Sequence, residues 1–162
     1  MIESPPLQLE VARRHAAKAS GGISNDAIYT AILRAVEDFC AGGSVLDFGA
    51  GTGNLTRKLL QRGRFAQVSA ADLMDQPAEL GIRWIRADLN NSLPLRDETF
   101  DTIIAAEVIE HLENPRAMAR ELFRLLKPGG VAIISTPNNE SWRSLLSLCL
   151  RGHHVAFLDG SY

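Results

Sequence analysis

VLDFGAGTGN, residues 45–54, places a short apolar run directly before three alternating glycines. The run Val45–Phe48 is typical of a buried strand, and the glycines allow the backbone to turn sharply. After the last glycine, Leu55, Leu59 and Leu60 recur at helical spacing. A strand, a glycine-rich turn and a helix in this order open a unit in which ligands bind at the carboxyl ends of parallel strands. The loop at 49–53 is therefore a candidate ligand site.

Four further apolar runs, separated by amphipathic segments, predict the remaining strands: Phe65–Ala71, Ile82–Ile85, Phe100–Ala105 and Val131–Ile134. Asn114-Pro115 predicts the start of a helix, and Pro128-Gly129-Gly130 predicts a tight turn into the last strand. Near-continuous apolar strands between helices indicate a parallel sheet that is covered on both faces. The predicted fold class is α/β, a Rossmann-like, mostly parallel sheet with helices on both faces. We expect it to be truncated after the fifth strand, which leaves that strand at an exposed edge.

The residues before Val45 predict two helices, one at Leu9–Ala19 and one that runs from the cap cluster Ser24-Asn25-Asp26 to about Cys40. We expect a helical cap at 1–43 that closes over the ligand and a ligand-binding domain at 44–162, together forming one structural domain. Beyond the last strand, Ser141–Arg151 predicts another apolar helix.

Composition excludes several classes of protein. The chain of 162 residues has room for one domain, and its formal net charge of −2 gives no global attraction to nucleic acid. Cys40 and Cys149 lack CxxC spacing, so we expect reduced core residues in a cytoplasmic protein. The apolar stretch Leu145–Leu150 is too short to span a membrane, although it or the exposed sheet edge could support a homodimer.

Acidic residues recur at the predicted strand ends. Asp47 stands two residues ahead of the first loop glycine, and Asn54 replaces the third glycine of the dinucleotide fingerprint. A fixed carboxylate there opposes a pyrophosphate but suits a ligand with a cationic amino group. No Lys or Arg is expected to compensate it. The loop is therefore predicted to hold a cation or a zwitterion.

Two more carboxylates extend this pattern. Asp72 follows the second strand, 19 residues after Gly53, which is the usual spacing for an acid that accepts both ribose hydroxyls. Asp88 follows the third strand and is placed to accept from an adenine amino group, with the Leu89 amide nearby. Each Asp alone could equally be a helix cap or a solvated loop acid. Three at successive strand ends favour a nucleoside site.

The chain resembles class I S-adenosylmethionine-dependent methyltransferases, particularly the branch that includes the ubiquinone-biosynthesis O-methyltransferases. The resemblance rests on five runs: VLDFGAGTGNLT (Val45–Thr56), AADL (Ala70–Leu73), ADL (Ala87–Leu89), FDTIIAAEVIEHLENP (Phe100–Pro115) and LLKPGGVAIISTPN (Leu125–Asn138). It implies S-adenosylmethionine as cofactor, S-adenosylhomocysteine as product and a small-molecule acceptor, methylated at oxygen. The resemblance specifies the cofactor far better than the acceptor.

The resemblance also implies roles for individual residues. Those implied to contact the cofactor are Asp47 (amino group), Gly49, Ala50, Gly51 and Gly53 (methionine and ribose), Asp72 (ribose hydroxyls), Leu73 (adenine face), Asp88 and Leu89 (adenine amino edge), and Ala105 and Glu107 (near the sulfur). His111 is the candidate general base for an acceptor hydroxyl, although a His there could instead cap or pack its turn.

Glu107, Glu110 and His111 form E-x-x-E-H, and a similar triplet binds a divalent ion in some related O-methyltransferases. Two carboxylates and an imidazole suit Mg²⁺ or Mn²⁺ better than structural zinc. The same string also fits a polar helix start, so a metal is not favoured.

Three alternative functions stay open. A non-catalytic S-adenosylmethionine-binding module fits the short C-terminal part. An RNA methyltransferase is opposed by the lack of a basic cluster with interleaved aromatic residues. A nicotinamide-dependent oxidoreductase is opposed by Asn54 and Asp47.

Overall fold

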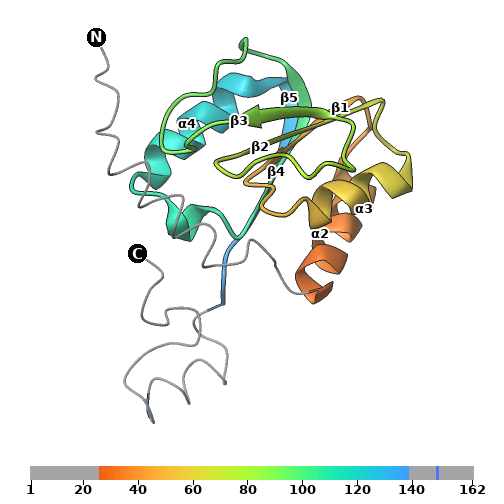
Figure 1. The fold of residues 1–162 in the computed structure, drawn as a ribbon, viewed down its shortest axis with the longest axis horizontal. Helices are drawn as coiled ribbons and strands as arrows, with labels where there is room; N and C mark the ends of the chain where they lie inside the picture. Colours follow the sequence, from red (N-terminus) through yellow and green to blue (C-terminus); the bar gives the residue numbers. More distant parts are fainter. Residues whose placement is uncertain (1–25, 139–148, 150–162) are drawn as a thin grey trace.

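The computed structural model describes residues 26–138 and 149. Within them, five parallel strands form one sheet in the order β3-β2-β1-β4-β5 (Figure 1). The elements are α2 (Asp26–Phe39), β1 (Ser44–Phe48), α3 (Asn54–Arg62), β2 (Gln67–Asp72), β3 (Arg83–Arg86), β4 (Phe100–Ala106), the 3-10 helix η1 (Ile109–His111), α4 (Pro115–Leu125) and β5 (Leu126–Ser135). Strands β1, β2 and β3 progress toward one edge, whereas β4 and β5 lie on the other side of β1. The strand order therefore reverses between β1 and β4, where open α/β sheets bind their ligands.

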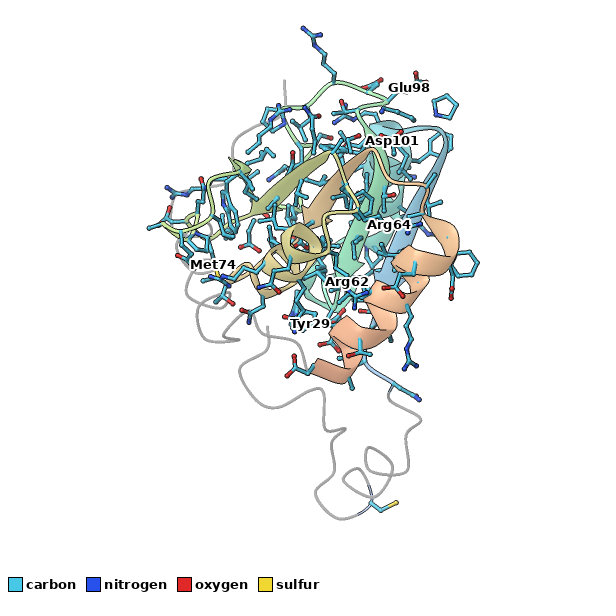
Figure 2. All side chains as sticks on the ribbon, turned by 90° about the vertical axis from the view of Figure 1, so that its right-hand side faces the viewer. Tyr29, Arg62, Arg64, Met74, Glu98 and Asp101 are labelled. Atoms are coloured by element: carbon cyan, nitrogen blue, oxygen red, sulfur yellow. The ribbon has the colours of Figure 1, made fainter. Side chains whose placement is uncertain are left out.

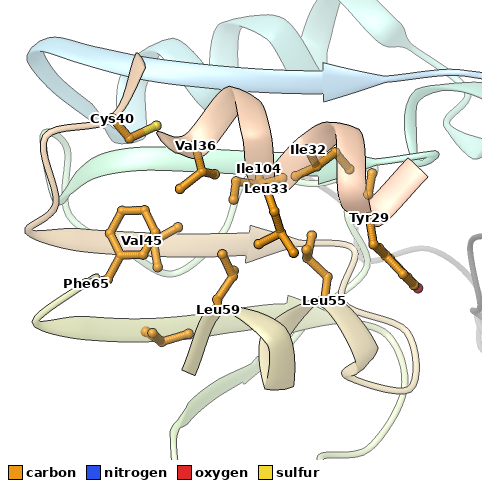
Figure 3. Close-up of a cluster of buried hydrophobic side chains, with 12 residues drawn as sticks. Tyr29, Ile32, Leu33, Val36, Cys40, Val45, Leu55, Leu59, Phe65 and Ile104 are labelled. Carbon is orange, nitrogen blue, oxygen red and sulfur yellow. The ribbon is translucent and has the colours of Figure 1, made fainter. Parts of the chain in front are cut away.

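Helices cover both faces of this sheet, which confirms the predicted α/β class. On one face, α2 and α3 pack over β1 and β4, and Figure 3 shows Ile32, Leu33 and Val36 of α2 directed toward these strands. On the other face, α4 contributes Met118, Leu122 and Leu125 to a second buried cluster. Alternation along the strands supplies both clusters, because successive side chains point to opposite faces.

The predicted strands are confirmed with small shifts of their ends, except that β5 begins five residues earlier than predicted. The turn predicted at Pro128-Gly129-Gly130 is present as an irregularity inside β5, where the pairing jumps from Phe100–Leu126 to Thr102–Val131. Helix α4 passes directly into β5, and these three residues lie within that strand. Pro128 has no N–H to give to the ladder, and the pairing with β4 shifts register between Phe100 and Thr102. Gly129, at φ 79°, adopts the left-handed conformation that this irregularity requires.

Two local predictions have different outcomes. Asn114 caps α4 as expected: its side chain accepts from the Ala117 amide at 3.0 Å, and Pro115 occupies the first turn. Both cysteines are free, but only Cys40 is a core residue, since Cys149 is exposed. The predicted helices at Leu9–Ala19 and Ser141–Arg151 lie outside the described residues, apart from Cys149 in the latter.

The amino ends of the strands are held together by Asp101. Its Oδ2 accepts from the Ser44 amide, the Ser44 hydroxyl and Lys127 Nζ, each at 2.8 Å. The Lys127 ammonium and the Ser44 donors stabilise the carboxylate and lower the pKa of Asp101 to about 2. Figure 2 shows Asp101 and Met74 at opposite ends of the sheet. Asp101 therefore joins three strands at the end remote from the candidate site.

Within residues 26–138 and 149, no helix is both long enough and apolar enough to cross a lipid bilayer.

Candidate functional site

The glycine loop connects β1 to α3 at the carboxyl end of the sheet. Gly49, Gly51 and Gly53 have φ values of 86°, 53° and 77°, in the left-handed region that residues with a Cβ atom rarely adopt. The amides of Gly49 and Ala50 both donate to the Ala71 carbonyl, at 2.8 and 3.2 Å. The loop is therefore fixed to the end of β2 through its backbone.

At two of these positions the space beside the glycine is filled by the chain itself. A Cβ atom on Gly49 would lie 2.3 Å from Val108 Cγ2, and one on Gly53 would lie 2.5 Å from Leu80 Cδ1. Both distances are far below van der Waals contact. Sequence reasoning explained the glycines by close approach of a ligand. The structure shows that Gly49 and Gly53 also permit close packing of the segments after β4 and β2.

Asp47, in β1, is a buried carboxyl that lacks one hydrogen-bond partner. Its side chain is on the α3 side of the sheet, where Oδ2 accepts from the Thr56 hydroxyl at 2.5 Å. Oδ1 is buried and has no hydrogen-bond partner among the residues that the structure describes, and the residue is 1 % exposed. Burial raises the pKa of Asp47 to about 7, with a smaller contribution from the nearby charge of Asp72. A cationic donor would satisfy Oδ1 and favour the ionised carboxylate.

Asp72, at the end of β2, also holds the glycine loop, through its side chain. Its Oδ2 accepts from the Gly51 amide at 2.7 Å and its Oδ1 accepts from the Met74 amide at 2.8 Å. Each carboxylate oxygen has capacity for a second hydrogen bond. The carboxylate can therefore order the loop and still accept from a ligand hydroxyl. Sequence reasoning predicted a ligand contact here but not the contact with Gly51.

The other predicted nucleoside contacts lie along the next strand end. Asp88 follows β3, and its Oδ1 accepts from the backbone amide and the side-chain amide of Asn90, both at 3.0 Å. Leu89 packs against the second buried cluster, and Leu73 is half-buried directly after β2. The three acids therefore lie at the carboxyl ends of adjacent strands, as expected.

Residues after β4 form the other side of the site. Ala105 is fully buried within the second cluster, so its side chain faces the core. Glu107 has φ 54°, a conformation that costs free energy for a non-glycine residue, and its amide donates to the carbonyl and hydroxyl oxygens of Ser135. The carboxyl end of β5 therefore fixes Glu107 beside the end of β4.

The E-x-x-E-H residues are not arranged as a metal site. Among the described residues, no three His, Cys, Asp or Glu side chains converge on a common point suited to an ion. His111 is exposed on η1, whereas Glu110 is half-buried and its Oε2 has no hydrogen-bond partner within residues 26–138 and 149. Burial raises the pKa of Glu110, and the repulsion of Glu107 adds to this, while His111 and Thr136 oppose it.

A basic residue lies beside the loop, but its ion pair is with Glu79, so the expectation that no Lys or Arg compensates Asp47 is not contradicted. Arg57, in the first turn of α3, donates to the Thr52 carbonyl at 2.9 Å and forms an ion pair with Glu79. Sequence reasoning missed this pair, because Glu79 is 22 positions from Arg57 along the chain and belongs to a segment without helix or strand periodicity. The only available signal was the position of Arg57, one turn after Gly53.

Comparisons with known proteins agree with this geometry. The methyltransferase-domain family matches residues 23–161. The ubiquinone biosynthesis O-methyltransferase of Pseudomonas entomophila is 34% identical over 121 residues, which cover 67% of this chain and 50% of that protein. The demethylmenaquinone methyltransferase of Clavibacter sepedonicus is 34% identical over 128 residues, covering 71% and 51% respectively.

A solved S-adenosylmethionine-dependent methyltransferase from Archaeoglobus fulgidus shares the fold, with a TM-score of 0.62 at 21% identity, over 81% of this chain and 61% of that one. The chain spans about half the length of these two curated relatives.

Proposed function

Because the chain belongs to the methyltransferase-domain family, of the class I S-adenosylmethionine-dependent type, we propose that it transfers a methyl group from S-adenosylmethionine to the oxygen of a small molecule. The observation that carries this proposal is the buried, unpartnered Oδ1 of Asp47 beside the glycine loop. A buried acceptor without a donor is costly, so it indicates a group that only a ligand supplies. The cationic amino group of the cofactor has the required charge.

We propose that the remaining cofactor contacts follow the order of the strands. Asp72 accepts the ribose hydroxyls, Leu73 covers the adenine, and Asp88 with the Leu89 amide binds the adenine amino edge. The residues that line the methionine and ribose portion are Gly49, Ala50, Gly51 and Gly53. Near the sulfur, Ala105 contributes through its backbone, because its side chain faces the core, and Glu107 contributes from the strained position after β4.

When bound, the cofactor supplies a methyl group already activated by its sulfonium. The chain then has to hold the acceptor in line with that methyl group and exclude water, and such positioning lowers a barrier by roughly 7–11 kcal/mol in favourable cases. His111 is proposed to take the proton of the acceptor hydroxyl.

Two of the alternative functions, the nicotinamide-dependent oxidoreductase and the RNA methyltransferase, lack a supporting observation. For a nicotinamide enzyme, the buried carboxyl of Asp47 beside the loop would oppose a pyrophosphate. For an RNA methyltransferase, the formal charge of −2 supplies no general attraction. A non-catalytic cofactor-binding module shares the same cofactor site, and only the search for a methylated product separates it from an enzyme.

Ligand-induced stabilisation tests the cofactor directly. S-adenosylhomocysteine at 100 times its Kd is expected to stabilise the fold by about 2.7 kcal/mol, which raises the melting temperature by several degrees. NAD at the same concentration is expected to produce no shift. Scanning fluorimetry with both ligands measures this, and a shift with NAD alone would contradict the proposal.

Replacing Asp72 with Asn tests the ribose assignment. Removal of the charge weakens the contacts with Gly51, Met74 and the ribose together, so the Kd for S-adenosylhomocysteine is expected to rise at least about tenfold. Asp75→Asn is the matched control, because Asp75 lies three residues after Asp72, is exposed and is paired with Arg86. Titration calorimetry that gives the same Kd for both variants would remove Asp72 from the site.

Replacing His111 with Gln tests the proposed base. Methyl transfer is expected to fall by about 10² to 10⁴ while S-adenosylhomocysteine binding stays unchanged, because general-base catalysis contributes on that scale. The measurement follows label from methyl-tritiated cofactor into small molecules of a cell extract. Glu113→Gln, a neutralised exposed carboxyl two residues away, serves as the control. Full activity in the His111 variant would show that another group takes the proton of the substrate hydroxyl.

A further inference from the structure

Arg57 joins the glycine loop to the segment that follows β2. Its Nη1 donates to the Thr52 carbonyl at 2.9 Å and to Asn54 Oδ1 at 3.0 Å. Its Nη2 pairs with Glu79, in the segment that connects β2 to β3. One planar guanidinium therefore binds two residues of the loop region and one residue of the 73–82 segment, a geometry that suits the fixed fork of arginine donors.

The 73–82 segment connects β2 to β3 without a helix and is ordered by backbone and side-chain hydrogen bonds, such as the Leu80 amide to the Pro77 carbonyl at 3.0 Å. The Gln76 amide donates to the carbonyls of Leu80 and Ile82, and the Trp84 indole donates to the Met74 carbonyl at 3.0 Å. Leu80 is buried and occupies the space that a Cβ atom on Gly53 would fill. The segment therefore lies against the end of the glycine loop, on the side of Asp72 and Leu73.

The pairing with Glu79 also neutralises the charge that Arg57 brings to this region. The guanidinium hydrogen bond lowers the pKa of Glu79, and a carboxylate with an ordinary pKa of 4.5 is already ionised at neutral pH. An uncompensated arginine beside the loop would repel a cationic ligand.

We propose that Arg57 and Glu79 form a clamp that holds the glycine loop and the 73–82 segment together, and that this clamp sets the affinity for the cofactor. The inference rests on the proposed function, since it concerns the same site. Arg57 is a positioning residue here: it acts through the backbone of Thr52 and through Glu79, without touching the ligand. Binding is strengthened because the two walls of the nucleoside site are ordered before the ligand arrives.

Titration calorimetry with S-adenosylhomocysteine on the full chain tests the clamp. Arg57→Ala is expected to raise the Kd about tenfold, because the glycine loop and the 73–82 segment then have to be ordered when the ligand binds. Arg57→Lys should give an intermediate Kd, because a single ammonium cannot serve both the loop carbonyl and Glu79. Arg62→Ala is the matched control: Arg62 lies on the same helix and forms a similar exposed ion pair, with Glu37.

A double-mutant cycle separates the clamp from a general loss of stability. Arg57→Ala and Arg62→Ala are each expected to lower the melting temperature only slightly, as exposed ion pairs do, while only Arg57→Ala changes the Kd. Glu79→Gln should weaken binding alone but add nothing to Arg57→Ala. An unchanged Kd in Arg57→Ala, an equal effect in Arg62→Ala, or additive effects of Arg57 and Glu79 would overturn the clamp. If the wild-type chain does not bind S-adenosylhomocysteine, the proposed function fails first and this inference with it.

Discussion

Gly49→Ala is expected to lower the free energy of unfolding by about 3 kcal/mol, the combined cost of a left-handed alanine and an overpacked contact. The glycine has φ 86°, and a Cβ atom would lie 2.3 Å from Val108 Cγ2. Neither partner can move freely, because Val108 is buried and the Gly49 amide is bonded to the Ala71 carbonyl at 2.8 Å. Urea denaturation monitored by circular dichroism measures the loss.

Gly63→Ala supplies the control for backbone strain without a clash. Gly63 ends α3 at φ 61°, and a Cβ atom there would meet nothing within 4 Å. That variant is expected to lose only about 1 kcal/mol. Combining Gly49→Ala with Val108→Ala should recover part of the loss, since the smaller side chain removes the contact. Equal losses at Gly49 and Gly63 would show that packing against Val108 is unimportant.

Asp47→Asn is expected to make the ligand-free protein more stable, increasingly so as the pH rises from about 4 to 8. The folded-state pKa of about 7 lies above the value of 3.8 for an unperturbed Asp, so the folded state binds more protons than the unfolded state in this window. Folding stability therefore falls as pH rises through it, by up to about 4 kcal/mol for a difference of about three pKa units. Asn carries no charge and escapes this loss.

The same substitution should remove binding of S-adenosylhomocysteine, because the ligand amino group would face an amide in place of a carboxylate. Denaturation curves at pH 5 and pH 8, with calorimetry at pH 8, measure both effects. Asp101→Asn is the control with the opposite sign: its pKa is lowered to about 2, so that variant should be less stable at neutral pH, and the difference should disappear in acid. A pH-independent difference between Asp47→Asn and wild type would contradict the buried, ionisable carboxyl.

The strands and their order of appearance could be predicted from the sequence because each depends on a local pattern. The run Ile103–Ala106 is apolar at every position, so it fits the interior of a sheet covered on both faces. The cap at Asn114 is equally local, since it joins residues three positions apart. The irregularity at Pro128-Gly129-Gly130 is local as well, but its place inside β5 depends on the pairing of Leu126 and Val131 with β4.

The candidate site was predictable from the sequence only where it depends on chain order. The positions of Asp47, Asp72 and Asp88 at three strand ends follow from chain order in a parallel sheet. The missing partner of Asp47 and the clamp of Arg57 do not, because they depend on side chains that meet from separate segments.

By its alternating apolar runs and glycines alone, the sequence determined a parallel α/β sheet and the edge at which the candidate site lies. Tertiary structure alone decided which glycines make room for Val108 and Leu80, which carboxyl is buried without a donor, and which cation lies beside the loop. The physical reason is the separation along the chain of the residues that interact. Strands and caps are fixed by neighbours within a few residues. Burial, charge pairing and close packing depend instead on segments that meet only when the chain is folded.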